Sequence, residues 1–556
     1  MKINDLKNRD DLAKFLKIEL KKLTYILYKK KVENFYETFS IPKKNGEERI
    51  INAPKDNLKY ILKILERKLN EIYNENYCKN RFDNIAQAFR KKKSFITNAL
   101  LHRNKKYVIN IDLKNFFDSF HFGRVKGFFE KDKLFLLPEE VSIVIAQLTC
   151  YHGKLPQGAP TSPVITNFIC RILDKRIVKL SNKYRLSYTR YADDLTFSTN
   201  DFKIQENYET FLEELRKMIK NFGFEINEEK TSFRSNRCRQ TVTGLVVNKK
   251  VNCKREYYKK TKAMAHALYK TGEFYIDGNK GTVNQLEGRF SFINQIDQHN
   301  NIINNKNILD DRFNIREYEY KKFLVYKLFL QNNLPLIITE GKTDVRYIKA
   351  ALMKYHERYP NLIRKEKEKY IFEIKFLKRS KRLMYFFKLS LDGADTNKNI
   401  YYIYEHKKGS IYDLFIKKYK IIPKNPVILI FDNESNKDKP LKKFLNVVNN
   451  NSISNEVFKN LNACLKKESN LFILTNPKVE NNQNTEIEEL FLPETLNVCI
   501  DGKKFSLKEN YDNTKYYGKD TFSKFVLKNY STIDFSNFVP MLDALNNIVL
   551  NYNKNN

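Results

Sequence analysis

The segment Tyr188–Phe197 constrains the fold most, because two adjacent aspartates, Asp193 and Asp194, lie between runs of alternating apolar and polar residues. Alternation predicts half-buried strands, and aspartate is common in tight turns, so we expect a β-hairpin with both carboxylates at its tip. Two interpretations are open. The tip is either an ordinary solvated turn, or half of a two-metal site whose Mg²⁺ ions clamp the attacking and leaving oxygens of a phosphoryl transfer. The second interpretation requires a third carboxylate.

A third carboxylate follows another apolar segment. Tyr107–Ile111 predicts a buried strand, and Asp112 comes directly after it. An acid where a strand leaves a sheet can face a hairpin paired alongside. Asp112, Asp193 and Asp194 are therefore the candidate metal ligands and catalytic residues. Phe117 is a candidate contact to the sugar of an incoming nucleotide, where it would exclude a 2′-hydroxyl; a plain core aromatic is the alternative.

The region before these acids predicts helices and a second hairpin. Apolar residues at helical spacing in 10–31 predict amphipathic helices with basic outer faces. At 39–54 two short strands flank an Asn-Gly turn. Lys43 and Arg49 beside that turn are either solvated or placed to reach a triphosphate. The apolar positions of the predicted helices are Leu12, Phe15, Leu16, Leu20, Leu23, Leu27 and Tyr28.

A rigid loop lies between the acids. Residues 154–163 contain three prolines and a glycine ahead of a predicted helix over 164–179. Such a loop lets backbone approach a ligand closely. The amide of Gln157 could contact a nucleotide or template, or be solvated.

The 556-residue chain is strongly basic, with a net charge of +37. This excess favours a polyanionic partner, nucleic acid first and an anionic membrane second, although most charge runs are solvated faces. The start of the chain lacks the apolar core of a signal peptide, and no run of about eighteen apolar residues occurs. A cytoplasmic protein without a membrane partner is expected. The cysteines form no Cys-x-x-Cys pair, so neither structural zinc nor a disulfide framework is indicated.

Several strings stand in the order found in reverse transcriptases, and two of them resemble motifs of the retron enzymes, Asn-Ala-x-x-His and Val-Thr-Gly. Residues 1–320 therefore resemble a bacterial retron reverse transcriptase. The strings are Asn98–His102, Asp112 with Phe116 and Phe117, the loop Leu155–Pro163, Tyr191–Asp194, Asn227–Thr231 and Val242–Gly244.

The resemblance implies an α+β right-hand polymerase. Its parts would be fingers with N-terminal helices at 1–100, a palm at 101–245 and a thumb at 246–325. It implies RNA-directed DNA synthesis with Mg²⁺ and dNTPs. A cognate structured non-coding RNA would supply primer and template and leave a branched RNA–DNA product.

Individual roles also follow from the resemblance. Lys43 and Arg49 would contact the triphosphate, and Lys230 would donate a proton to the departing pyrophosphate. Gln157 and Gly158 would contact nucleotide and template. The stretch 86–91 departs from the usual His-Gly-Phe turn, so no role is carried over to it. In 246–325, interleaved tyrosines and lysines suit either a nucleic-acid grip or a solvated helix face.

The composition changes near residue 332, and a second domain is predicted. Leu336–Thr339 predicts a short buried strand ending in Glu340, followed by a helix over 345–356. Val427–Phe431 predicts a second strand that ends in Asp432 and Glu434. Acids at the ends of two apolar strands fit a parallel α/β sheet that holds a metal at its carboxyl edge. A helix N-cap is the alternative, favoured for Asp344.

These segments together resemble a Toprim domain, the metal-dependent nucleic-acid cleavage module of topoisomerases, primases and overcoming-lysogenization-defect nucleases. The resemblance implies an α/β domain over 326–556, with Glu340 in acid/base chemistry and Mg²⁺ held by Glu340, Asp432 and Glu434. The Asp-x-Glu string departs from the family's Asp-x-Asp and lengthens one arm. Further candidate ligands are Glu488 and Glu489.

Retron reverse transcriptases fused to Toprim domains are a known architecture, which suggests an antiphage defence protein. In that hypothesis the Toprim nuclease is an effector restrained by the branched DNA, and its target is either RNA, with transfer RNA among the candidates, or DNA. The alternatives are a Toprim domain that serves only as a nucleic-acid-binding scaffold, and a reverse-transcriptase fold without catalysis. A homo-oligomer is left open.

Overall fold

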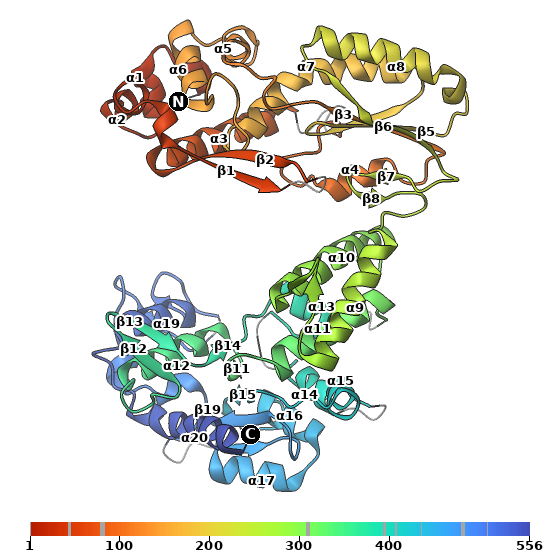
Figure 1. Ribbon diagram of the computed structural model, residues 1–556. Helices are drawn as coiled ribbons and strands as arrows, with labels where there is room; N and C mark the ends of the chain where they lie inside the picture. The colour runs from red at the N-terminus through yellow and green to blue at the C-terminus, as the bar shows by residue number, and fades with distance from the viewer. Residues whose placement is uncertain are drawn as a thin grey trace. The chain divides into compact units, whose positions relative to one another are not determined.

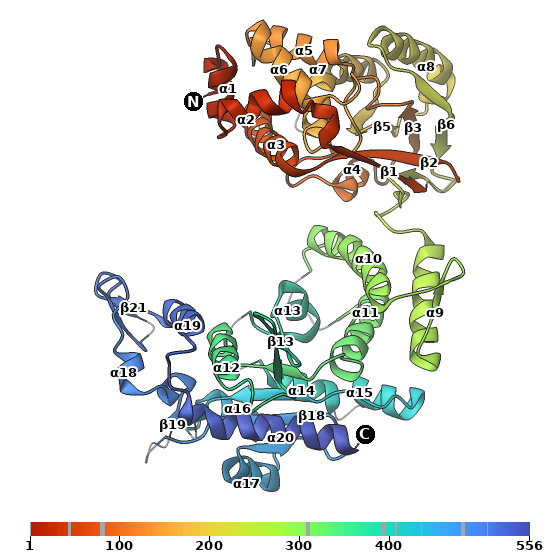
Figure 2. The ribbon, with the colours of Figure 1, turned by 60° about the vertical axis from the view of Figure 1, so that its left-hand side comes forward.

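The computed structural model divides into two compact units, which are coloured along the chain in Figures 1 and 2. The N-terminal unit comprises Met1–Tyr257 with Ile296–Asn300, and the C-terminal unit comprises Tyr258–Gln295 with Asn301–Asn556. The predicted boundaries at 245 and 325 stay predictions. The structure describes residues 2–42, 46–77, 84–306, 312–391, 393, 396–405, 409–434, 436–479, 484–508 and 510–555.

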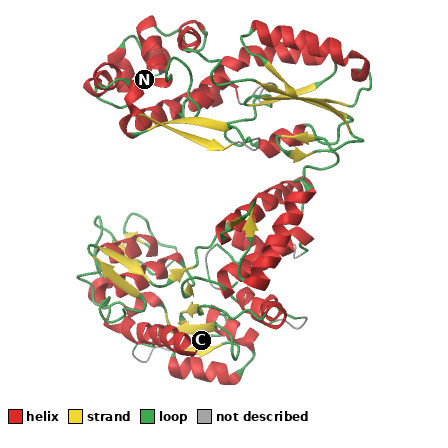
Figure 3. Cartoon of the chain, in the orientation of Figure 1, coloured by secondary structure: helices red, strands yellow, loops and turns green. Residues whose placement is uncertain are grey.

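A four-stranded antiparallel sheet lies at the centre of the N-terminal unit, in the order β4-β5-β3-β6. Helices α7 (Ser162–Lys183) and α8 (Ile204–Asn221) cover one face, and α4 (Phe95–Leu101) lies on the other (Figures 1 and 3). The β4–β5 pairing confirms the predicted hairpin. The strands are β3 (Tyr107–Leu113), β4 (Ser187–Tyr191), β5 (Asp194–Thr199) and β6 (Ile226–Ser235), with a small hairpin of β7 (Thr241–Val242) and β8 (Leu245–Val246) beside α4.

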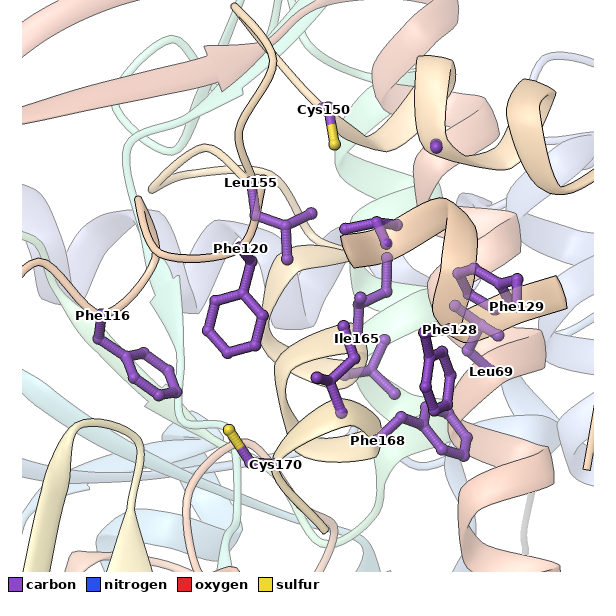
Figure 4. Close-up of a cluster of buried hydrophobic side chains, with 14 of the residues drawn as sticks. Leu69, Phe116, Phe120, Phe128, Phe129, Cys150, Leu155, Ile165, Phe168 and Cys170 are labelled. Carbon is purple, nitrogen blue, oxygen red and sulfur yellow. The ribbon is translucent and has the colours of Figure 1, made fainter. Parts of the chain in front are cut away.

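The remaining part of this unit is helical, with one long hairpin. The hairpin β1–β2 confirms the prediction over 39–54, although residues 43–45 lie outside the described part. Figure 4 shows part of the core, where Phe120 lies beside Leu155, and Phe128 lies beside Phe168 of α7. The elements are η1 (Ile3–Asp5), α1 (Arg9–Phe15), α2 (Leu20–Thr24), the π-helical turn η2 (Tyr25–Lys29), η3 (Val32–Phe35), β1 (Tyr36–Pro42), β2 (Glu48–Pro54), α3 (Asp56–Tyr77), α5 (Phe122–Lys131) and α6 (Glu139–Thr149).

The helices predicted over 10–31 are confirmed, but two of their predicted buried residues are not buried. Leu20 is 40% exposed and Tyr28 is 49% exposed, whereas the other five apolar positions lie in the core. The reason is local. The chain breaks between α1 and α2, where Lys17 has φ +55°, and α2 continues into the wider π-helical turn η2, so a single 3.6-residue period does not hold across the segment.

The C-terminal unit contains the predicted parallel sheet, in the order β14-β11-β15-β18-β17 with only β17 antiparallel. Alternate residues of β15 pack into two different cores. Val427 and Leu429 pack into one core, and Ile428 and Ile430 pack into the other. Both faces of the sheet are therefore covered, as is usual for parallel sheets. The strands are β11 (Leu336–Ile338), β14 (Lys375–Phe376), β15 (Val427–Phe431), β17 (Asn462–Cys464) and β18 (Leu471–Thr475).

Helices predicted as a thumb share one of these cores. Phe290 of α10 and Phe323 of α11 belong to the same buried cluster as Leu429 of the sheet. The helices on this side are α9 (Arg255–Thr271), α10 (Val283–Ile303), α11 (Ile315–Val325), η4 (Tyr326–Leu330), α13 (Lys381–Phe387), α14 (Lys398–Tyr404), α15 (Ile411–Asp413), η5 (Leu414–Lys418), α16 (Pro440–Val448) and α17 (Asn451–Asn460).

The opposite face is covered mainly by α12, α19 and α20. No helix in the described ranges is long and apolar enough to cross a membrane. The remaining elements are α12 (Lys342–Lys354), η6 (Ile487–Leu490), α18 (Pro493–Leu496), α19 (Lys519–Lys528), η7 (Ser536–Phe538) and α20 (Val539–Asn555), with the short strands β9 (Tyr275–Ile276), β10 (Asn279–Lys280), β12 (Ile363–Glu366), β13 (Lys369–Phe372), β16 (Asn433–Glu434), β19 (Asn484–Thr485), β20 (Lys504–Phe505) and β21 (Tyr516–Tyr517).

Candidate functional site

The strand register of the N-terminal sheet brings three aspartates together. Asp112 in β3 pairs directly with Asp194, the first residue of β5. Asp193 precedes it in the turn, where its carbonyl accepts a hydrogen bond from the Leu113 N–H at 3.1 Å. Two neighbouring strands and one turn therefore present the carboxylates at one end of the sheet.

A buried arginine holds the tip of this hairpin. Ala192 lies in the left-handed region at φ +57°. Arg190 Nη1 donates to the Ala192 carbonyl at 3.4 Å and to Asn167 Oδ1 at 3.3 Å. Its Nε and Nη2 donate to the two carboxylate oxygens of Asp174, both at 2.9 Å. The prediction assigned no role to this pair. The sequence did offer a signal for this pair. Arg190 is a cation within a predicted strand, and a guanidinium that is buried there requires an acidic partner.

Burial and mutual repulsion make the aspartates easier to protonate. Burial raises the pKa of Asp193, with the Asp112 carboxylate adding to the effect. Burial, then Asp193 and Asp112, raise the pKa of Asp194 to about 7. Carboxylates that oppose each other's ionisation gain free energy from a nearby cation.

Lys230 supplies one such cation. Its Nζ lies 3.0 Å from Asp112 Oδ2, and this hydrogen bond raises the pKa of the lysine. The amide of Asn227 donates to the same oxygen at 3.3 Å. Both residues belong to β6, which pairs with β3. The predicted proton donor thus lies against the predicted metal ligand.

Arg49 is the described member of the two predicted triphosphate contacts, since Lys43 lies outside the described residues. It is exposed in β2 and lies near enough for its charge to oppose the rise in the pKa of Asp193. Phe117 lies in the turn after β3, half-buried, with its ring 5.4 Å from that of Phe116. Phe116 is the core aromatic, 3% exposed. The roles of Arg49 and Phe117 stay predictions.

The loop at Gly158 makes a close backbone approach to strand β2, whereas the predicted approach to a ligand stays a prediction. The Asn52 N–H donates to the Gln157 carbonyl at 2.7 Å. Gly158 has φ +125°, and a Cβ there would lie 2.6 Å from the Asn52 carbonyl oxygen. The glycine therefore joins the hairpin β1–β2 to the loop. Contacts of Gln157 and Gly158 with nucleotide or template stay predictions.

The two strings typical of retron enzymes lie side by side behind the hairpin. His102 is fully buried, with Nδ1 2.7 Å from Ser198 Oγ and Nε2 2.7 Å from Thr189 Oγ1. The Thr189 hydroxyl also donates to Asn98 Oδ1 at 2.6 Å, and the Thr243 hydroxyl donates to the Phe95 carbonyl at 2.8 Å. These contacts hold β4 and β5, the two strands on either side of the turn that carries Asp193.

A second acidic cluster lies at the carboxyl edge of the parallel sheet. Glu340 Oε1 accepts a hydrogen bond from the Asp432 N–H at 3.1 Å. Burial, with Asp344 and Glu434 nearby, raises the pKa of Glu340 to about 8. Burial and the Glu340 carboxylate raise the pKa of Asp432 well above its usual range. The expectation that Asp344 is the N-cap of α12 is wrong: Gly341 is the N-cap, and Asp344, the third helical residue, accepts a hydrogen bond from the Gly341 N–H at 2.8 Å.

Lysines neutralise the outer members of this cluster. Lys439 forms an ion pair with Glu434 at 2.5 Å, and Lys519 forms one with Glu488 at 3.1 Å. Glu488 is 1% exposed, and its charge contributes to the raised pKa of Asp432. Glu489 instead caps a short helix, accepting from the Glu486 N–H at 2.7 Å. Of the two further candidates, only Glu488 therefore faces the acids.

Arg379 and Asn476 complete this edge, and neither was predicted. Arg379 Nη2 donates to the Thr339 carbonyl at 3.0 Å, directly before Glu340, and its charge opposes the raised pKa of that glutamate. Asn476 Nδ2 donates to Asp432 Oδ1 at 2.6 Å. Arg379 follows β14 and Asn476 follows β18. The strand order of the folded sheet shows that these strand ends lie at the same edge, and spacing in the sequence does not.

Neither cluster is arranged as a preformed cage. Within the described ranges, no three acidic, histidine or cysteine side chains are already oriented around one point as metal ligands. The donor chemistry nevertheless fits Mg²⁺, because each cluster offers hard carboxylate oxygens whose mutual repulsion a divalent cation would relieve.

Comparisons with known proteins agree with the geometry of the N-terminal unit. The model of the family described as "Reverse transcriptase (RNA-dependent DNA polymerase)" matches residues 41–254. Retron Ec86 reverse transcriptase of Escherichia coli is 31% identical over 299 residues, which cover 52% of this chain and 85% of that protein. The fold of the N-terminal unit is thus that of a reverse transcriptase. More narrowly, the chain belongs to the retron reverse transcriptase family.

Two further comparisons mark the limits of the likeness. Retron Mx162 reverse transcriptase of Myxococcus xanthus is 32% identical over 333 residues, and the chain spans only 65% of its length. Among solved structures, telomerase from Candida albicans in complex with a TWJ fragment of telomeric RNA covers 52% of this chain and 59% of its own, at 11% identity. Its TM-score of 0.31 is too low to support a structural argument.

Proposed function

We propose that the N-terminal unit is an RNA-directed DNA polymerase that uses dNTPs and Mg²⁺. The observation that carries the proposal is the register of β3 with β5, which sets Asp112 directly opposite Asp194 and beside Asp193. Mg²⁺ bound there would stabilise the charge that develops on the attacking and leaving oxygens.

Other residues of the chain would bind the substrate, transfer a proton or position the aspartates. Arg49 would approach the triphosphate from β2, and Lys230 would donate a proton to pyrophosphate from its place beside Asp112. Phe117 would exclude a 2′-hydroxyl at the sugar. Arg190 would hold the Ala192 carbonyl and so fix the turn that carries the aspartates.

Primer extension tests this site. Asp193→Asn combined with Asp194→Asn should abolish extension of a DNA primer on an RNA template, because two of the three carboxylates lose their charge while keeping their shape. Asp118→Asn, which alters an exposed acid in the turn after β3, is the matched control and should leave extension intact. Undiminished extension by the double variant would refute the assignment and favour a fold without catalysis.

We further propose that the template is a cognate structured RNA and that the product is a branched RNA–DNA molecule. The family membership and the buried motif around His102 support this specialisation. Co-expression with the neighbouring non-coding locus should yield branched DNA, which debranching or RNase treatment would shorten to linear DNA. A locus without an inverted-repeat RNA gene would contradict the retron product.

For the C-terminal unit we propose a Toprim-type, Mg²⁺-dependent nuclease that serves as the effector of antiphage defence. The supporting observation is the parallel sheet with Glu340 and Asp432 joined by a hydrogen bond at its carboxyl edge. Glu340 would carry the acid/base step, and Glu340, Asp432 and Glu434 would hold the metal. The branched DNA made by the N-terminal unit would restrain the activity.

Removing the branched DNA separates this proposal from a scaffold role. The stripped protein should cleave RNA or DNA in the presence of Mg²⁺, and Glu340→Gln or Asp432→Asn should abolish cleavage. Asp438→Asn, an exposed acid six residues beyond Asp432, is the matched control. A stripped protein that cuts neither nucleic acid would favour the scaffold, and cleavage by both site variants would refute the residue assignment.

A further inference from the structure

The N-terminal helices expose two tyrosines on a π-helical turn. Tyr25 is 46% exposed and Tyr28 is 49% exposed, and both lie in η2, where the Lys30 N–H donates to the Tyr25 carbonyl at 2.8 Å. Ile26 and Leu27, between them, are buried in the core. The turn therefore anchors itself with its apolar residues and leaves the rings free of the core, and π-helical turns of this kind occur often at functional sites.

The Tyr28 ring is fixed in place from one side. The Arg9 guanidinium lies 5.7 Å from the ring centroid, while Arg9 Nε donates to Glu140 Oε1 at 2.6 Å. Glu140 belongs to α6, so the arginine is held by a separate helix. A ring that is already oriented loses little freedom when a planar ligand stacks on it.

Exposed cations surround the two rings. Lys21 precedes Tyr25 by one helical turn, and Lys29, Lys30 and Lys31 follow Tyr28. Across 17–33 six lysines stand against two glutamates. Lys21 and Lys29 form no ion pair with any acid in the part of the chain that the structure describes. The positive charges of Lys21 and Lys29 are therefore not neutralised by acidic residues of the described part of the protein.

This surface lies away from the aspartate site within the same unit. Figures 1 and 2 both place α1 and α2 at the end of the N-terminal unit opposite β5 and β6. A nucleic acid held there would be a segment other than the one copied at Asp112.

We propose that Lys21, Tyr25, Tyr28 and Lys29, here called the tyrosine–lysine surface, bind single-stranded RNA outside the polymerase site. Bases would stack on the two rings while the lysines contact phosphates, the combination used by proteins that hold single strands. An anionic membrane fits less well, because Leu23, Ile26 and Leu27 are buried in the core and Leu20, 40% exposed, is the one large aliphatic side chain that residues 20–29 leave at the surface. The inference goes beyond the proposed polymerase function and does not require it.

Fluorescence anisotropy with the full-length protein tests the proposal. The probe is a 5′-fluorescein oligouridylate of about 20 nucleotides, with the polymerase site saturated by an unlabelled RNA–DNA primer–template. Tyr25→Ala and Tyr28→Ala should each weaken binding about fivefold or more, whereas Tyr25→Phe and Tyr28→Phe should retain it because they keep the stacking face. Lys21→Gln should reduce the slope of log affinity against log salt by about 0.7.

Matched controls lie on the same unit. Phe202, 61% exposed, and the exposed Lys203 are an aromatic and a cationic residue next to each other in the sequence and outside the tyrosine–lysine surface. Phe202→Ala and Lys203→Gln should leave binding unchanged, and all variants should extend the primer–template as the parent protein does. If the parent fails to extend it, the polymerase proposal fails while the binding result still stands.

Three outcomes would overturn the inference. The first is unchanged oligouridylate binding in the tyrosine variants, and the second is an equal loss in the controls. The third is a loss of binding to phosphatidylserine vesicles without a loss of RNA binding, which would assign the surface to a membrane.

Discussion

At the scale of single residues, His102 shows how a polar group is kept inside the N-terminal unit. Both of its ring nitrogens face hydroxyl groups, Ser198 on one side and Thr189 on the other. Burial lowers the pKa of His102 to about 3. The imidazole is therefore neutral when folded and takes up a proton far more readily when the chain unfolds.

This difference predicts a pH-dependent stability. An unfolded histidine titrates near pH 6.5, so the contribution of His102 is complete above that pH and is lost as the pH falls toward 3. By pH 5 the loss is about 2 kcal/mol. Urea unfolding of the parent and His102→Gln between pH 8 and pH 5 should show the difference in unfolding free energy shrinking by that amount. The exposed His266→Gln is the control, and a pH-independent difference for His102→Gln would contradict the prediction.

Gly158 makes a second prediction for a single residue. Alanine there would meet both a left-handed backbone and the Asn52 carbonyl, so Gly158→Ala should lower the free energy of unfolding. Gly153→Ala is the matched control, because Gly153 has φ +74° but no atom within 4 Å of an added Cβ. We expect Gly158→Ala to cost about 1–3 kcal/mol more than the control in urea unfolding. Equal costs would show that the backbone conformation alone requires the glycine.

The acids of both sites were predictable, while the residues that hold them were not. Asp112 and Glu340 each follow an apolar run, and Asp193 lies between two alternating runs, which are patterns visible in the sequence. Asp174 and Arg379 carry no such pattern, because each meets its partner only after separate elements pack. A partner's identity depends on the register and crossing of elements, which local periodicity does not encode.

At the scale of elements, the hairpin β4–β5 depends on helix α7. Arg190 reaches from β4 to Asp174 of α7 and at the same time holds the Ala192 carbonyl. The arginine is 1% exposed and the aspartate 5% exposed, so both charges are desolvated. The ion pair thus joins the helix to the turn that carries Asp193 and Asp194.

Removing one member of this ion pair should lower the free energy of unfolding of the N-terminal unit and not only loosen the hairpin. Asp174→Asn leaves a buried guanidinium without its counter-charge and should cost about 3–5 kcal/mol in urea unfolding. The exposed bidentate pair of Arg216 and Glu228 is the control, and Glu228→Gln should cost less than about 1 kcal/mol.

Replacing both members separates stability from activity. Arg190→Met combined with Asp174→Leu removes both buried charges and should recover most of the stability. Primer extension should remain low, because nothing then donates to the Ala192 carbonyl. Full activity in the double variant would show that the clamp serves stability alone.

At the scale of the whole molecule, the sequence predicted the two kinds of sheet but not which core the intervening helices join. The antiparallel hairpin and the parallel strands follow from alternating and continuous apolar runs. Helices α9 to α11 were predicted as a thumb by their position after the palm. Their apolar residues would suit packing against the palm or against the second domain. Only the packing in the structure shows that Phe290 shares a core with Leu429.

This shared core makes the last prediction. Phe290 is 1% exposed and stacks on Tyr320, with ring centroids 5.4 Å apart. Phe290→Ala should remove about 3–5 kcal/mol from the C-terminal unit, so amide hydrogen exchange should accelerate in β11 and β15. Exchange in β3 and β5 should stay as in the parent, because those strands belong to a different buried cluster.

Phe168→Ala in α7 is the matched substitution, since Phe168 is likewise fully buried but lies in the core of the N-terminal unit. It should accelerate exchange in β3 and β5 and leave β11 and β15 unchanged. If Phe290→Ala instead loosened β3 and β5, the helices would belong energetically to the polymerase unit, as their position in the sequence suggests. The pattern of exchange therefore decides whether a change in the predicted thumb reaches the acids at Glu340 and Asp432 or those at Asp112 and Asp194.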